Sequence, residues 1–87
     1  MVSMKIVVES NAGTGWGVYE YMFGSYCNLG HRENLSDALT MANNFSKSKW
    51  MPIEFRVPMS TGDGGEHVYS QYLRSDADVL QAILTHC

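Results

Sequence analysis

One amphipathic segment, flanked on both sides by strand-like sequence, constrains the fold of this chain more than any other feature. Between residues 34 and 45, apolar side chains recur at helical spacing and form a single stripe made of Leu35, Ala38, Leu39, Ala42 and Phe45. Asn34 is a favourable N-cap residue, Asp37 stands in capping-box register, and residues 46–49 end the segment with lysines. A helix with a single apolar stripe has to bury it against another element.

Three strands are predicted before this helix. Residues 4–10 are rich in β-branched side chains, residues 17–23 follow the turn formers NAGTG, and residues 26–31 follow the tight turn Gly24-Ser25. We therefore expect a three-stranded meander to precede the helix.

Two strands and a second helix are predicted after it. Residues 50–58 alternate, with one face formed by Met51, Ile53, Phe55 and Val57 and the other by Trp50, Pro52, Glu54 and Arg56. The prolines at 52 and 58 restrict the pairing of this strand to an edge or to its middle. A hairpin loop over residues 59–65 leads to a strand over residues 66–72. Ser75 then caps a helix with Asp78 as its capping-box partner, and the buried face is predicted to hold Val79, Leu80, Ala82, Ile83 and Leu84.

These elements predict one α+β domain spanning residues 1–87. Its expected architecture is a two-layer sandwich with the order strand, strand, strand, helix, strand, strand, helix. We expect the five strands to form an antiparallel sheet, with both helices packed on one face and the other face left open.

Charge and hydropathy exclude several function classes. The net charge is −3 and the six lysines and arginines are scattered, so direct nucleic-acid binding is not expected. The nine acidic residues are too diluted to imitate DNA. No apolar run is long enough for a membrane span or a signal peptide, which predicts a protein of the cytoplasm without membrane contact.

The stretch NAGTGWG, residues 11–17, resembles a phosphate-binding loop in its glycine content. Phosphate loops lead into a helix whose N-terminal amides hold the anion, whereas a strand follows here and no Lys-Ser/Thr pair closes the loop. We interpret these glycines as residues that permit positive φ in a turn. No cofactor is predicted.

The candidate metal ligands are Cys27, His31, Glu66, His67, His86 and Cys87, and Cys27 with His31 is also the candidate nucleophile and base. On a strand, residues four apart are separated by roughly 13 Å, so they cannot share an ion without a sharp bend. A triad with Asp37 or Glu33 lacks a nucleophile elbow and an enclosed cleft. The sequence therefore predicts no metal and no enzyme, and in a reducing compartment Cys27 and Cys87 are expected as free thiols rather than as a disulfide.

The aromatic residues suggest a recognition surface instead. Tyr19, Tyr21 and Phe23 share one face of the second strand, and Trp16, Val18 and Met22 share the other. Tyrosine, tryptophan and arginine are enriched in protein–protein hot spots, although tyrosines also pack well on ordinary sheets. Trp16, at a turn, would insert into a pocket of a partner. The predicted partner-binding residues are Trp16, Tyr19, Tyr21, Trp50, Glu54 and Arg56, and a homodimer would use the same chemistry.

The helix Leu35-Ser36-Asp37-Ala38-Leu39-Thr40-Met41-Ala42, followed by Trp50, Pro52 and the strand Ile53–Val57, resembles small bacteriophage host-takeover proteins. These include an inhibitor of bacterial RNA polymerase and some anti-CRISPR proteins. The resemblance implies a small inhibitor that binds a bacterial protein or ribonucleoprotein complex, such as a CRISPR effector, and blocks it. Two alternatives stay open: a small-molecule or metal-binding sensor or enzyme built on Cys27, His31 and the glycine loops, and a sheet that stacks single-stranded nucleic acid on its aromatics.

Overall fold

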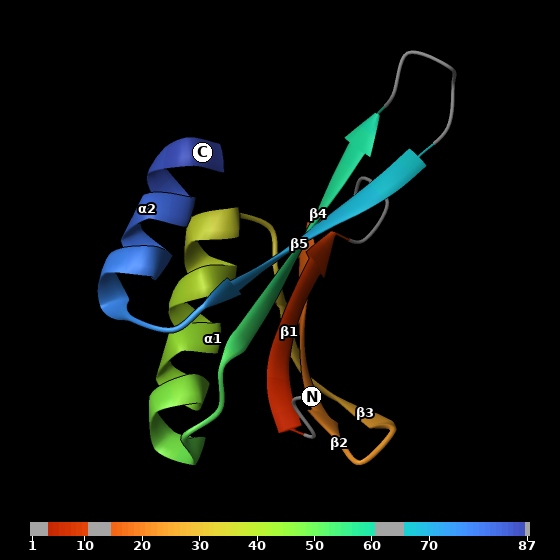
Figure 1. The fold of residues 1–87 in the computed structure, drawn as a ribbon, viewed down its shortest axis with the longest axis vertical. Coiled ribbons are helices and arrows are strands. Elements are labelled where there is room, and N and C mark those ends of the chain that lie inside the picture. The colour runs from red at the N-terminus through yellow and green to blue at the C-terminus, as the bar shows by residue number, and fades with distance from the viewer. Residues whose placement is uncertain (1–3, 11–14, 61–65, 87) are drawn as a thin grey trace.

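The computed structural model describes residues 4–10, 15–60 and 66–86. It contains five strands and two helices, which confirms the predicted α+β class and the order of the elements (Figure 1). Their bounds are β1 Met4–Ser10, β2 Trp16–Met22, β3 Ser25–Arg32, α1 Leu35–Lys49, β4 Ile53–Ser60, β5 Glu66–Leu73 and α2 Asp76–His86.

The sheet is mixed, and the prediction of a purely antiparallel sheet was wrong. The strand order is β3-β2-β1-β4-β5, in which β1 and β4 are parallel while the other three pairs are antiparallel. The parallel pair joins Ile6 to Ile53 and Glu9 to Arg56. The reason is the direction of α1. The meander ends at the opposite end of the sheet from where β1 begins, and α1 returns the chain to the first end, so β4 enters beside β1 in the same direction (Figure 1).

The apolar stripe of α1 forms the centre of the core. Leu35, Ala38, Leu39 and Ala42 are buried against Ile6, Val8, Val18, Ile53 and Phe55 of the sheet. Helix α2 lies beside α1 and adds Val79 and Ala82 to the same cluster. Leu80 and Leu84, predicted for this buried face, are instead exposed. The core therefore draws on strands and both helices at once.

The passage from α1 to β4 differs from the prediction. Residues 50–52 do not belong to β4, which begins at Ile53. Trp50 is the C-cap of α1, with a left-handed backbone and φ of 58°, and its N–H donates to the carbonyl of Ser46. Met51 is buried, and the carbonyl of Pro52 accepts a hydrogen bond from the N–H of Ile6 at 2.9 Å. The reversal at Trp50 takes its side chain out of the strand alternation.

At the turns and helix starts, some of the predicted features are present in the structure and others are not. Phe23 and Gly24 both have positive φ and form the turn between β2 and β3, so Phe23 does not lie on the β2 face with Tyr19 and Tyr21. Ser75 caps α2 as predicted, because its Oγ accepts a hydrogen bond from the N–H of Asp78 at 3.2 Å. Asn34 occupies the N-cap position of α1 without a side-chain cap bond. Gly15 has φ of 100°, as the turn interpretation requires, whereas residues 11–14 and 61–65 lie outside the described residues.

Candidate functional site

The face of the sheet opposite to Ile6, Val8 and Phe55 carries a group of polar and aromatic side chains, which we call the open face. Its position follows from strand alternation and from the register of neighbouring strands: Tyr21 lies opposite Lys5 on the adjacent strand. The open face consists of Lys5, Val7, Glu9, Tyr19, Tyr21, Tyr26, Glu54, Arg56 and Tyr72.

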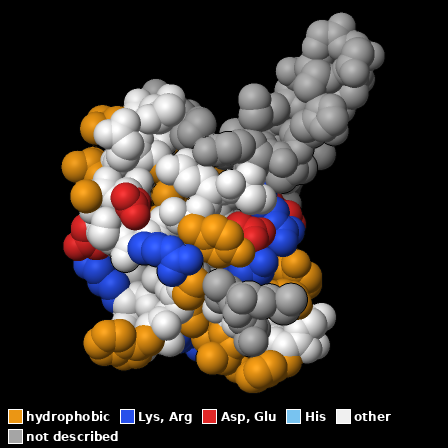
Figure 2. All heavy atoms as spheres, viewed as in Figure 1, with side chains coloured by type: hydrophobic (Ala, Val, Ile, Leu, Met, Phe, Trp, Pro, Cys, Tyr) orange, Lys and Arg blue, Asp and Glu red, His pale blue; other side chains and the backbone are white. Residues whose placement is uncertain are grey.

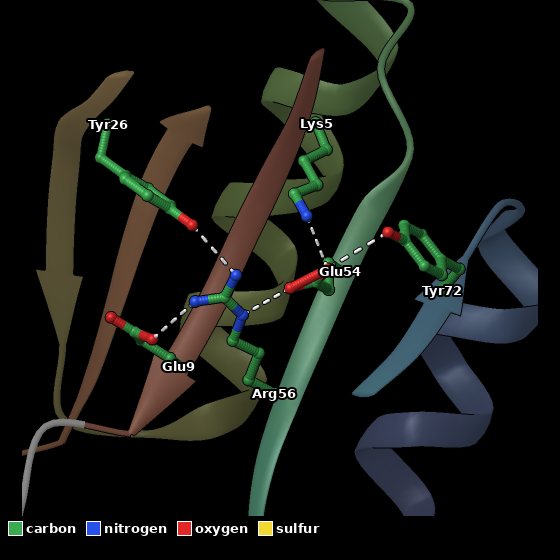
Figure 3. A network of polar contacts seen from close by, with 6 residues as sticks. All are labelled: Lys5, Glu9, Tyr26, Glu54, Arg56 and Tyr72. Carbon is green, nitrogen blue, oxygen red and sulfur yellow. Dashed lines mark hydrogen bonds and ion pairs between the residues drawn. The ribbon is translucent and has the colours of Figure 1, made fainter. Parts of the chain in front are cut away.

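Glu54 is the centre of this face. It lies in β4 between β1 and β5, and only 6% of its surface is exposed. Its carboxylate accepts hydrogen bonds from Lys5 Nζ at 2.7 Å, from the Tyr72 hydroxyl at 3.2 Å and from Arg56 Nε (Figure 3). A carboxylate this buried is tolerated because its oxygens are satisfied by two cations and a hydroxyl.

Arg56 extends the network toward the other edge of the sheet. Its guanidinium donates to Glu54, to Glu9 Oε2 at 3.3 Å and to the Tyr26 hydroxyl at 3.1 Å (Figure 3). Four strands, β1, β3, β4 and β5, thus contribute to one continuous set of contacts. The planar guanidinium suits this role because it presents several donors in a fixed geometry.

The network shifts the pKa values of Glu54, Lys5 and Arg56. Burial alone would raise the pKa of the Glu54 carboxyl, but hydrogen bonds from Lys5 and Arg56 and the attraction of both cations outweigh it and hold the pKa below its usual value. The hydrogen bond to Glu54 raises the pKa of Lys5 against the opposing effect of burial. All three side chains are therefore charged at neutral pH.

Aromatic contacts fix the remaining part of the open face. The rings of Tyr21 and Tyr26 lie 4.8 Å apart at a tilt of 57°, and Lys5 Nζ lies 5.1 Å from the centre of the Tyr21 ring. Val7, the apolar member of this face, is fully buried. The two cations of the face, Lys5 and Arg56, are balanced by Glu9 and Glu54, so these four charges cancel on an aromatic surface.

The six residues predicted to bind a partner do not form one surface. Tyr19, Tyr21, Glu54 and Arg56 lie together on the open face. Trp16 lies on the other face of β2, half-buried against the core, with its ring centre 5.7 Å from that of Phe55. Trp50 lies at the end of α1 rather than beside Arg56.

Sequence reasoning missed Lys5, Glu9, Tyr26 and Tyr72. A signal for the first two was present: both alternate with Ile6 and Val8, which face the core. No local signal places Tyr26 beside Arg56 or Tyr72 beside Glu54, because the two tyrosines reach the network from β3 and β5, the strands at opposite edges of the sheet.

Cys27 and His31, the residues of the sensor alternative, point to opposite faces of β3. Cys27 is paired with Glu20, which lies on the same side of the sheet as Ile6, whereas His31 is paired with Gly17, on the side of the open face. Cys27 is an exposed free thiol. Within residues 4–10, 15–60 and 66–86, no three His, Cys, Asp or Glu side chains are grouped so that they could hold a metal ion.

Among the described residues, two grooves lie away from the open face and have none of its residues in their linings. One lies between the last turns of α1 and the start of α2, and the other lies along α1 near Arg32. Neither of the described helices has the length and hydropathy needed to cross a bilayer. The chain matches no protein-family model, no curated protein and no solved structure.

Proposed function

We propose that this chain is a non-enzymatic protein-binding module that docks its open face on a bacterial protein complex and blocks the activity of that complex. This is the class of function implied by the resemblance to small phage inhibitors. We also propose that both helices pack on the apolar face of the sheet, which leaves the opposite face for the partner.

The observation that carries the proposal is the network centred on Glu54. It holds Arg56, Tyr26 and Tyr72 in fixed positions by hydrogen bonds, although 54% of Tyr26 and 39% of Tyr72 are exposed. Side chains that are already ordered lose little conformational entropy when they bind. Tyrosine and arginine in such positions are the residue types that dominate binding energy at protein interfaces.

Charge distinguishes this surface from a nucleic-acid platform. Lys5 and Arg56 are both paired with carboxylates of the same face, so little positive charge is left for a phosphate backbone. A neutral aromatic surface is instead typical of the central part of a protein–protein interface, where charged residues are depleted.

The proposal is tested by replacing exposed tyrosines of the open face while keeping Glu54 and its bonds to Lys5 and Arg56. We expect Tyr26→Ser and Tyr72→Ser, separately and together, to abolish the capture of a host protein that the tagged wild-type chain recovers from bacterial lysate. Leu84→Ala is the matched control, because Leu84 is an exposed apolar residue of α2. Circular dichroism should show the same fold for all variants.

Two outcomes would contradict the proposal. If both tyrosine variants recover the same proteins in the same amounts as the wild type, the open face is not the binding surface. If native mass spectrometry of the purified chain shows a bound ion or small molecule, the sensor or enzyme alternative replaces the binding module.

A further inference from the structure

The two most exposed large apolar side chains of the described residues share an unusual backbone conformation. Trp50 is 93% exposed with φ of 58°, and Phe23 is 77% exposed with φ of 49°. They are the non-glycine residues with positive φ in this part of the chain. Bulky side chains are disfavoured there, and glycine or asparagine normally ends a helix with this geometry. A large ring at such a position is held out into solvent by the backbone.

A groove lies directly beside Trp50. It has a volume of about 460 Å³ and runs between the last turns of α1 and the start of α2. Its lining includes Met51, Pro52 and Leu73 together with the polar side chains of Lys47, Arg74 and Asp76. Figure 2 shows hydrophobic side chains exposed at the end of the molecule where α1 finishes. Trp50 contributes to the rim but does not fill the groove, because its own side chain is almost fully exposed.

The charges around this groove have both signs. Lys47 Nζ lies 2.9 Å from the Asp76 carboxylate, and Asn43 Nδ2 donates to the same group at 3.1 Å. Arg74 lies over the ring of Tyr72 at 5.6 Å and has no ion pair within the described residues. The site therefore presents an apolar cleft, an aromatic ring at its edge, an exposed carboxylate and a cation without a carboxylate partner.

We propose that the occupant of this groove is a second copy of the same chain, and that the protein forms a two-fold symmetric dimer through it. A symmetric interface uses the same patch on both copies, so the patch must be complementary to itself. The groove and Trp50 meet this condition because they lie side by side. A two-fold axis between them places each indole in the partner's groove and brings Arg74 of each copy toward Asp76 of the other.

This interface lies at the helices and away from the open face. The dimer would therefore present two open faces at the same time, and its formation does not depend on the function proposed above. When two binding surfaces are linked in one dimer, the dimer binds a partner of repeated subunits more tightly than the monomer does, although each surface makes the same contacts as before.

The test uses the purified protein alone. Sedimentation velocity and light scattering over a concentration series of about two orders of magnitude around the micromolar range should show the mass rising to twice the 9.7 kDa of the monomer. Trp50→Gly should remain monomeric throughout, with an unchanged fold, because glycine suits the left-handed backbone. Phe23→Asn is the matched control: it removes the other exposed ring with positive φ, at a turn that favours Asn-Gly, and should leave the dimer intact.

A charge exchange tests the orientation of the two copies. Arg74→Glu should weaken dimerisation at least tenfold, and the double variant Arg74→Glu with Asp76→Arg should restore it, because the cross-dimer pair is then reversed. Three outcomes would overturn the inference: a wild-type chain that stays monomeric over the whole series, a Trp50→Gly variant that dimerises like the wild type, or a double variant no better than Arg74→Glu.

Discussion

At the scale of single residues, Glu54 determines how the open face is ordered. It is buried in the middle of the sheet and holds Lys5, Arg56 and Tyr72 by direct hydrogen bonds. Replacing a carboxylate in such a position leaves two cations without their shared counter-charge. Glu54 therefore positions the other side chains of the open face, whereas the exposed tyrosines around it are the groups that a partner would contact.

Glu54→Gln is expected to destabilise the protein by about 2 kcal/mol, because the amide keeps the shape of the side chain but not its charge. That is a large part of a total stability of roughly 4 to 13 kcal/mol for a chain of this length. Urea unfolding at neutral pH measures the effect. Glu33→Gln, at an exposed position, is the matched control and should unfold like the wild type. Equal midpoints for all three proteins would show that the network does not stabilise the fold.

The pKa of Glu54 also predicts a pH dependence. Because this pKa is lower in the folded than in the unfolded chain, the carboxylate stabilises the fold fully above the ordinary value of 4.5 and loses its effect as the pH falls through the lowered value. Hydrogen bonds from Lys47 and Asn43 lower the pKa of Asp76 and add to the same trend. The difference in stability between the wild type and Glu54→Gln should therefore shrink as the pH is lowered from 7 toward about 3. A difference independent of pH would contradict the assignment.

Trp50 is the second residue whose substitution has a clear expected sign. A non-glycine residue in the left-handed region costs about 1 kcal/mol or more, and the exposed indole has little packing to offset this. Trp50→Gly should therefore raise the thermal unfolding midpoint of the monomer. Trp50→Ala keeps the strain and should not raise it. If glycine lowered the midpoint, the indole would have to stabilise the fold.

At the scale of elements, the two helices begin differently. The Ser75 hydroxyl caps α2, and the Asp78 carboxylate accepts a hydrogen bond from the N–H of Arg74 at 3.0 Å. Helix α1 begins at Leu35, and its N-cap residue Asn34 makes no side-chain cap bond, but its apolar stripe is buried over more of its length. Cap bonds thus matter more for α2, which is the shorter helix at the edge of the core.

Ser75→Ala is accordingly expected to cost about 1 kcal/mol, the usual contribution of an N-cap. Asn34→Ala is the internal comparison, and it should cost clearly less because no cap bond is lost. Chemical denaturation of both variants in parallel measures the difference. Equal losses would indicate that the side chain of Asn34 caps α1 in solution.

At the scale of the whole molecule, one core cluster joins the sheet to both helices. It includes residues of β1, β2, α1, β4, β5 and α2. The strands of the parallel pair β1–β4 are separated along the sequence by β2, β3 and α1. Because no group of elements has a core of its own among the described residues, the chain should unfold in a single transition.

That cooperativity can be measured with two probes. The change in tryptophan fluorescence reports mainly on Trp16, which packs against Phe55, because Trp50 is already exposed in the folded chain. Far-ultraviolet circular dichroism reports on the helices and strands. The two denaturation curves should coincide. If the meander unfolded separately from α1 and β4, the two denaturation curves would have different midpoints, which would contradict a single core.

The order and class of the elements could be predicted because they depend on local patterns. The period of the apolar residues in α1 and the β-branched run in β1 are properties of neighbouring residues, and so is the cap at Ser75. Four of the six residues predicted for the surface share the open face for the same reason, since alternation along a strand fixes which side a residue occupies. Trp50 was misplaced because a left-handed residue interrupts that alternation and no glycine marks it.

The sequence by itself therefore determined the class, the order and most bounds of the elements, and the separation of Phe55 from Arg56 on opposite sides of one strand and of Tyr21 from Val18 on another. Only the tertiary structure decided that β4 lies beside β1 in parallel and that Glu54 joins Lys5, Arg56 and Tyr72 in one network. The physical reason is the range of the interactions. Periodicity and capping act within a few residues, whereas strand order and buried ion pairs depend on contacts between segments tens of residues apart, which no local pattern specifies.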